Sequence, residues 1–112
     1  MKGLTVRWSL ADAPAELSAS LPGYVAEGSH ARFEGMPGLA FKTWRMRAGE
    51  WFEGSYVFES DEARASFQET FTAGADSAPI SQLTGAAPIL IEACDIVAVA
   101  EGAAGFASTP QA

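Results

Sequence analysis

The segment 38–60 limits most strongly what this chain can fold into. It contains two runs of aromatic and long apolar residues, 39–47 and 50–59, with no proline inside either run. Ala48 and Gly49 separate the runs, and a short glycine-containing turn between two such runs is typical of a β-hairpin. We therefore predict two antiparallel strands joined by these two residues.

The register of this hairpin decides which side chains share a face of the sheet. A two-residue loop pairs Arg47 with Glu50, and side chains alternate along each strand. One predicted face then carries Leu39, Phe41, Thr43, Arg45, Phe52, Gly54, Tyr56 and Phe58. The other carries Ala40, Lys42, Trp44, Met46, Trp51, Glu53, Ser55 and Val57. Because both faces hold large apolar groups, both need a cover, and we predict helices on one side and a second copy of the chain on the other.

The N-terminal part of the chain predicts a strand and then a helix. Residues 4–10 alternate between apolar and polar side chains, which is the pattern of a half-buried strand. Residues 12–25 carry apolar side chains at helical spacing, but Pro22 interrupts them and predicts a kinked helix or two short pieces. Residues 27–37 are polar and contain glycines, so we expect a loop or a ragged helix end, with His30 solvated on the surface.

The C-terminal half predicts a second helix and a last strand. Ser60 is a good helix N-cap, and a stripe of apolar side chains follows it: Ala63, Phe67 and Phe71. Residues 72–88 indicate a long connection with one short helical turn, and residues 88–100 a strand in which Cys94 is a small buried residue. The order strand, helix, strand, strand, helix, strand predicts a ferredoxin-like α+β fold, a split βαβ antiparallel sheet with the helices on one face.

Length, charge and cysteine content exclude several classes of protein. The 112 residues suit one domain, which we expect over residues 1–101, followed by a Gly/Ala/Ser-rich tail over residues 102–112. The net charge of −7 argues against nucleic acid and anionic membranes as partners. A single cysteine excludes an intrachain disulfide, and no signal peptide or membrane span is recognisable, so we expect a cytoplasmic protein.

Metal and nucleotide sites lack support in the sequence. One histidine and one cysteine cannot make a standard zinc site, and no glycine-rich phosphate loop follows a strand and opens a helix. We therefore expect neither a metal nor a cofactor.

Several hairpin residues match a known motif. Pro37-Gly38-Leu39, Phe41-Lys42 and Trp44 on the first strand, followed by Gly54 and Tyr56-Val57-Phe58 on the second, resemble the YdhR-like monooxygenase family. The resemblance covers residues 36–100 well and the first strand loosely. It implies a dimeric α+β barrel, in which two ferredoxin-like subunits join their sheets. The chain departs from the family pattern at Glu53, where a glycine is expected, and in a longer segment 23–36.

The resemblance implies oxygenation of a small aromatic or hydrophobic substrate without a cofactor. Trp44, Tyr56 and Lys42 are the candidate catalytic residues, because an aromatic and phenolic wall would hold the substrate while its own carbanion or phenolate reduces dioxygen. The predicted register places Lys42 beside Glu53, where a carboxylate would tune proton transfer. The candidate substrate-binding residues are Phe41, Arg45, Glu53, Phe58 and Phe67.

Other interpretations of the same residues remain open at this point. Trp44 and Tyr56 also suit core or interface aromatics, Lys42 and Glu53 an ion pair at a rim or dimer interface, and Arg45 a solvated strand edge. On the same scaffold the protein would then be a non-catalytic dimer that binds small molecules. A third alternative is an isomerase or lyase that uses one general base and no oxygen.

Overall fold

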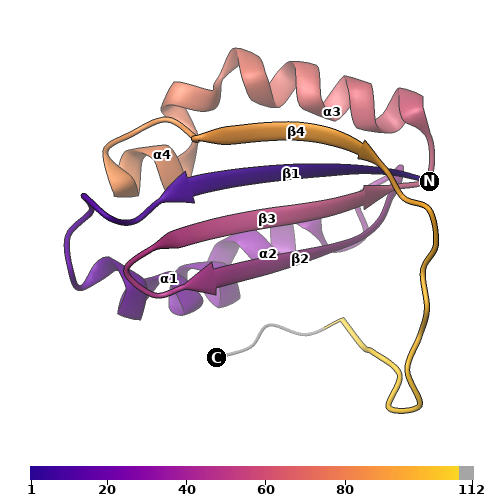
Figure 1. The fold of residues 1–112 in the computed structure, drawn as a ribbon, viewed down its shortest axis with the longest axis horizontal. Helices are drawn as coiled ribbons and strands as arrows, with labels where there is room; N and C mark the ends of the chain where they lie inside the picture. Colours follow the sequence, from indigo (N-terminus) through magenta and orange to yellow (C-terminus); the bar gives the residue numbers. More distant parts are fainter. Residues whose placement is uncertain (109–112) are drawn as a thin grey trace.

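A computed structural model describes residues 1–108 of the chain, which form a four-stranded antiparallel sheet (Figure 1). The strands are β1 (Lys2–Ser9), β2 (Leu39–Arg47), β3 (Trp51–Phe58) and β4 (Leu90–Asp95). Their order in the sheet is β2-β3-β1-β4, with β2 and β4 at the edges. This topology is that of a ferredoxin-like α+β fold, so the predicted fold class is confirmed.

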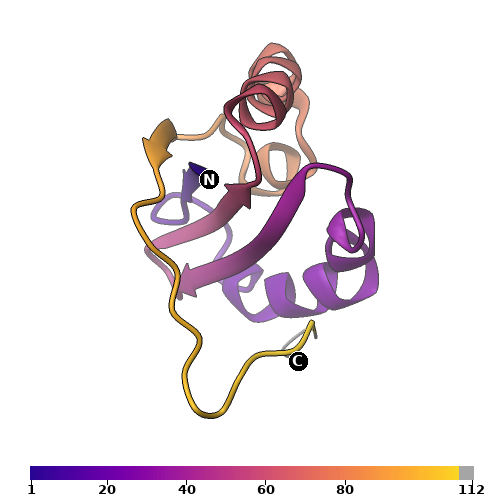
Figure 2. The ribbon, with the colours of Figure 1, turned by 90° about the vertical axis from the view of Figure 1, so that its right-hand side faces the viewer.

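Two helical units cover one face of the sheet. The first runs from α1 (Leu17–Tyr24) through a π-helical turn, η1 (Val25–Ser29), into α2 (His30–Phe33). The second comprises α3 (Asp61–Ala73), the 3-10 turn η2 (Ala75–Ser77) and α4 (Pro79–Thr84). Figure 2 shows both units on the same side of the sheet, while the segment after β4 leaves on the other side. We call the sheet face away from the helices the open face.

Local sequence signals account for the helix ends. Ser60 caps α3, since its Oγ accepts a hydrogen bond from the Ala63 backbone N–H at 3.1 Å, as predicted. Pro22 lies inside α1, and the helix continues past it through the π-helical turn to Phe33. Of the two alternatives predicted for residues 27–37, the structure shows the helix end, which continues to Phe33, and not the loop, because packing against β2 outweighs the weak helix propensity of this segment.

The hairpin differs from its prediction by one residue. Arg47 pairs with Trp51, so the loop comprises residues 48–50, and the Glu50 N–H donates to the Arg47 carbonyl at 2.9 Å. Gly49 adopts φ +75°, a left-handed conformation that this turn requires and that glycine adopts without strain. The extra loop residue moves every side chain of β3 to the opposite face relative to β2.

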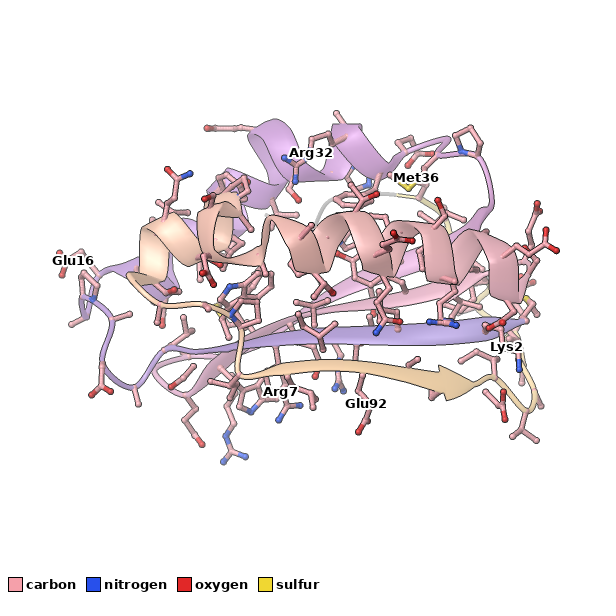
Figure 3. All side chains as sticks on the ribbon, turned by 90° about the horizontal axis from the view of Figure 1, so that it is seen from above. Lys2, Arg7, Glu16, Arg32, Met36 and Glu92 are labelled. Atoms are coloured by element: carbon pink, nitrogen blue, oxygen red, sulfur yellow. The ribbon has the colours of Figure 1, made fainter. Side chains whose placement is uncertain are left out.

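The corrected register changes which side chains share a face. The face toward the helices carries Lys42, Trp44, Met46, Phe52, Gly54, Tyr56 and Phe58. The open face carries Phe41, Thr43, Arg45, Trp51, Glu53, Ser55 and Val57. Figure 3 shows Arg7 of β1 and Glu92 of β4 on the open face as well.

The hydrophobic core lies between the sheet and the two helical units. Its most deeply buried apolar side chains are Leu4, Val6, Leu21 and Phe58. Trp8 of β1 donates through its Nε1 to Ser81 Oγ of α4 at 2.9 Å, which attaches the second helical unit to the middle of the sheet. No helix within residues 1–108 has the length and apolar character needed to cross a bilayer.

The last strand is shorter than predicted. It ends at Asp95, and residues 96–108 form neither a helix nor a strand. Cys94 is exposed, so its expected burial is wrong: it pairs with Gly3 on the open face of an edge strand, where nothing covers it within the described chain. Residues 109–112 of the predicted tail lie outside the described residues.

Candidate functional site

The amine of Lys42 occupies an aromatic environment on the helix side of β2. Its Nζ lies 3.1 Å from Tyr56 Oη, within hydrogen-bond distance. The same atom lies 3.4 Å from the ring centre of Phe33, and 4.4 Å from those of Trp44 and Tyr56. No carboxylate within residues 1–108 forms an ion pair with this amine.

These surroundings change the protonation of both groups. Burial and, to a smaller degree, the positive charge of Arg32 together lower the pKa of Lys42 from 10.5 to about 6. Cation–π attraction to the surrounding rings, worth about 0.5–2 kcal/mol, is smaller than the cost of burying a charge that has no carboxylate partner. Burial also raises the pKa of Tyr56, so its hydroxyl keeps its proton at neutral pH.

The π-helical turn positions three of the groups around the amine. Ser29, at the end of η1, accepts a hydrogen bond from Trp44 Nε1 at 3.1 Å. His30 packs on Trp44 with ring centroids 5.6 Å apart and an interplanar angle of 31°, and Phe33 lies edge-on to Tyr56 at 5.7 Å. Single π-helical turns are frequent at functional sites, because they shift the phase of the residues that follow.

Gly54 provides the space in which Lys42 and Tyr56 meet. A Cβ atom at this position would lie 3.2 Å from Lys42 Cε and also 3.2 Å from Tyr56 Cε1 and Oη. These distances are shorter than ordinary van der Waals contacts, so any side chain here would push the amine or the phenol aside. The absence of a side chain in the middle of β3 therefore serves the pairing of these two groups.

A cavity of about 360 Å³ opens next to the amine, between the sheet and the helices. We call it the inner cavity. Its lining includes Phe33, Lys42, Trp44, Tyr56, Phe67 and Phe71. A volume of this size falls within the range of about 300–1,000 Å³ that is usual for small-molecule sites, and the lining combines apolar walls with few polar groups. The inner cavity therefore suits a small aromatic or hydrophobic molecule.

A second hollow, of about 730 Å³, lies along the outer edge of β2. This edge groove is bounded by α2 and by the C-terminal segment, which contributes Val99, Ala100, Phe106, Ala107 and Ser108. Lys42 borders both the edge groove and the inner cavity. The Lys42 residue therefore separates the two hollows.

The other charged candidates lie on the open face. Glu53 is 1% exposed and accepts hydrogen bonds from Arg7 Nη2 at 2.7 Å, Arg45 Nε at 2.7 Å and Ser55 Oγ at 3.0 Å. Burial by itself would raise the pKa of Glu53, but the hydrogen bonds from Arg7, Arg45 and Ser55 outweigh it and hold the pKa below its ordinary value.

Two predicted pairings are therefore wrong. Lys42 does not lie beside Glu53, and Arg45 does not share a face with Tyr56, because the three-residue loop shifts the register by one. Lys42 instead meets Tyr56, and Arg45 meets Glu53. The amine thus has a phenol as its neighbour and no carboxylate.

The three remaining predicted site residues lie in different places. Phe67 of α3 packs on Tyr56 with ring centroids 4.9 Å apart and lines the inner cavity. Phe58 stacks on Tyr56 at 5.9 Å but is buried in the core. Phe41 lies on the open face, where it contacts Phe106 of the C-terminal segment at 5.9 Å.

The contribution of the first helical unit to the site was not predicted from the sequence. Ser29, His30 and Phe33 all border the site, yet they fall in a segment predicted as a loop or a ragged helix end. His30, expected to be solvated, packs on Trp44 with a side chain only 18% exposed. Val25, Ser29 and Phe33 are four residues apart, which is the spacing of one helix face, and this signal would have identified Ser29 and Phe33.

Comparisons with known proteins support the fold and give no information on the activity. No protein-family model and no curated protein matches this sequence. Among solved structures, the NE2512 protein of unknown function from Nitrosomonas europaea is similar to this chain, with a TM-score of 0.62 and 21% identity. The match covers 91% of this chain and 94% of that chain. At this identity the similarity shows a shared fold alone.

The site combines an amine, a phenol and apolar walls. Within the described part of the chain, no three His, Cys, Asp or Glu side chains come together in a way that would hold a metal ion. The groups at hand are an amine with a lowered pKa, a protonated phenol and aromatic walls. In chemical terms, a neutral amine can accept a proton, and a protonated phenol can donate a hydrogen bond to an oxygen that gains negative charge.

Proposed function

We propose that the protein binds a small aromatic molecule in the inner cavity and that Lys42 removes a proton from it. The observation that carries this proposal is the Lys42 amine, 3.4 Å from the Phe33 ring centre and 3.1 Å from Tyr56 Oη. A general base works best when its pKa lies near the working pH. Because burial lowers the pKa of Lys42 to about 6, the amine is neutral and able to accept a proton at neutral pH.

Tyr56 has the complementary role in this proposal. Its raised pKa keeps the hydroxyl protonated, so the phenol can donate a hydrogen bond to the oxygen of an enolate or phenolate. Trp44 and Phe33 form aromatic walls next to the amine, and an aromatic substrate gains from packing against such rings.

We extend the proposal to oxygenation without a cofactor, on the basis of the hairpin's resemblance to the YdhR-like monooxygenase family. In an anthrone-like substrate, Lys42 removes one proton from the methylene group between the two aromatic rings. The resulting carbanion reduces dioxygen: one oxygen atom becomes the new carbonyl, and the other leaves as water with the two methylene hydrogens. The substrate supplies all the electrons for this reaction.

Oxygen uptake with anthrone as the probe tests this function. Replacing Lys42 with Met should lower kcat/KM by at least about 100-fold, because a general base typically contributes a factor of that size or more. In the wild type, kcat/KM should rise with pH through about 6 and then level off, because only the neutral amine accepts the proton. Arg47→Met is the matched control on the same strand, since Arg47 pairs with Glu50 away from the inner cavity.

Each other outcome of this experiment points to a different function. Equal kcat/KM for the wild type and Lys42→Met would refute proton removal by Lys42. Turnover at an unchanged rate under argon would refute oxygenation and indicate an isomerase or lyase. Saturable quenching of tryptophan fluorescence without turnover would leave a binding protein.

We also propose that the protein is a homodimer joined through the open face. A second copy is the occupant that we favour, because the C-terminal segment places Val97, 95% exposed, and Phe106, 68% exposed, in solvent beyond β4. Two identical subunits with such segments bury each other's apolar side chains through a two-fold axis. A dimer of this kind also matches the α+β barrel that the family resemblance implies.

A further inference from the structure

The amine that serves as a base is also suited to a covalent reaction. We propose that Lys42 captures aromatic aldehydes and ketones in the inner cavity by forming a Schiff base with their carbonyl carbon. This proposal rests on the cavity and the amine of the proposed function, but it needs neither an acidic substrate proton nor oxygen. It therefore assigns a second class of ligand, carbonyl compounds, to the same site.

The geometry around Lys42 leaves room for a carbonyl group. Lys42 lines the inner cavity, and its Nζ lies against the rings of Phe33 and Tyr56, which line the same cavity, so a ligand ring there can bring its carbonyl carbon to Nζ. No ion pair with a carboxylate holds Nζ within residues 1–108.

Tyr56 supplies the proton transfers that the condensation needs. Nζ attacks the carbonyl carbon, the C=O π electrons move to oxygen, and one amine proton reaches that oxygen through the Tyr56 hydroxyl, 3.1 Å from Nζ. Tyr56 then delivers the second amine proton to the hydroxyl group of this carbinolamine as it leaves. The products are an imine and one water molecule, and no oxidant or reductant takes part.

The charged and titratable groups around the amine favour its neutral form. Burial is the main cause of its lowered pKa, and Arg32 of α2 adds a positive charge that acts in the same direction. Tyr56 faces the amine from β3, and His30 of α2 packs behind Trp44. A protonated amine is not a nucleophile, so this environment makes Lys42 reactive at neutral pH.

The chain contains its own internal control for this chemistry. Its only amines are the N-terminal amine of Met1 and the side chains of Lys2 and Lys42. Lys2 forms an ion pair with Asp95, and the hydrogen bond from its amine to Asp95 raises its pKa. At pH 7 less than about 0.1% of Lys2 is neutral, against most of Lys42, so Lys42 should react at least about a hundredfold faster than Lys2.

Reductive trapping tests this proposal on the full-length protein. The protein is incubated at pH 7 with benzaldehyde and sodium cyanoborohydride, which reduces an imine to a stable benzylamine. Intact mass spectrometry then counts the benzyl groups, and peptide mapping assigns each to Met1, Lys2 or Lys42. We expect one benzyl group on Lys42 at an early time, at least about a hundredfold more than on Lys2. Tyr56→Phe should lower the initial rate at Lys42 at least about tenfold while leaving the rate at Lys2 unchanged.

The controls separate this proposal from the proposed function. Benzyl alcohol has the same ring without the carbonyl, and its quenching of tryptophan fluorescence reports whether the inner cavity binds an aromatic molecule at all. Binding of benzyl alcohol without label on Lys42 would overturn the Schiff base and leave the cavity intact. Absence of both would overturn the cavity's role as well. Equal labelling of Lys2 and Lys42 would show that the site gives Lys42 no special reactivity, which also overturns the proposal.

Discussion

Lys42 stands in surroundings that disfavour its charged form. A lysine amine is normally solvated or paired with a carboxylate, whereas this one faces the rings of Phe33, Trp44 and Tyr56. Keeping the amine there costs the folded state free energy whenever the unfolded chain would protonate it. Such a cost is typical of functional residues, because a base or nucleophile needs a pKa near neutrality.

This cost predicts how stability changes with pH. Lys42 binds its proton less tightly in the folded protein, where its pKa is about 6, than in the unfolded chain, where it is near 10.5. The unfolded chain therefore holds more protons between these values, and the free energy of unfolding rises with pH by up to about 1.4 kcal/mol per unit from this residue. Lys42→Met should be more stable than the wild type at pH 6, by a margin that shrinks steadily toward pH 9.

Urea unfolding of both proteins from pH 6 to pH 9 measures this margin. Lys2→Met is the matched control, because the raised pKa of Lys2 keeps it charged throughout this range, and its difference from the wild type should stay constant. Parallel stability curves for the wild type and Lys42→Met would contradict the lowered pKa.

Three strands are joined on the open face by one buried carboxylate. Glu53 on β3 accepts hydrogen bonds from Arg7 on β1 and from Arg45 on β2. Trp51 covers both guanidinium groups, with its ring 4.3 Å from Arg7 Cζ and 5.4 Å from Arg45 Cζ. A cluster of this kind fixes the relative register of neighbouring strands, because a shift by one residue would leave the carboxylate without partners.

Replacing Glu53 with Gln should destabilise the sheet. The amide keeps the shape of the side chain but removes the charge that both arginines face, and we expect a loss of about 1–3 kcal/mol because the arginines are partly solvated. The contribution of Glu53 is complete above its ordinary pKa of 4.5 and declines as the pH falls toward its lower pKa in the folded protein. The difference between wild type and Glu53→Gln in urea unfolding should therefore shrink at acidic pH.

The exposed pair of Arg47 and Glu50 gives the control for this variant. Glu50→Gln removes a carboxylate from a surface ion pair and should change stability by less than about 0.5 kcal/mol. A Glu53→Gln variant as stable as Glu50→Gln would mean that the buried cluster does not hold the strands together.

The sequence predicted the elements better than it predicted their alignment. The strands, the Ser60 cap and the apolar helix stripe that contains Phe67 follow from periodicity and local chemistry. These signals depend only on the residues of the segment in which they occur. The loop of three residues instead of two depends on the φ of Gly49 and on cross-strand packing, so the hairpin segment alone did not decide it. For the same reason Trp44, Tyr56 and Lys42 were identified as candidates while the partners of Lys42 and Arg45 were wrong.

The whole molecule presents two unequal faces of one sheet. The helix side is filled by the core and the inner cavity, whereas the open face is bordered only by the C-terminal segment within residues 1–108. Half-buried apolar side chains such as Trp51 and Leu90 lie on this face beside the Glu53 cluster. These apolar groups on the open face are the basis of the proposed homodimer.

Native mass spectrometry tests this association directly. We expect the wild type to be a dimer at micromolar concentration and Leu90→Lys to be a monomer, because burying a lysine in an apolar interface costs several kcal/mol. Leu83→Lys is the matched control, since Leu83 is exposed on α4, on the helix side of the sheet, and it should stay dimeric. A wild-type monomer would refute the homodimer.

The π-helical turn in the first helical unit has a consequence for how the pocket can diversify. A π-helical turn takes up one residue more than an α-helical turn, and an α-helix advances by about 100° per residue. Substitutions that convert Val25–Ser29 to regular α-helix without a change in length would therefore rotate Phe33 by about that angle away from Lys42. Descendants of this chain can exchange one wall of the pocket in this way while Phe33, Lys42 and Tyr56 are all kept, and a comparison of these residues alone would overlook the change.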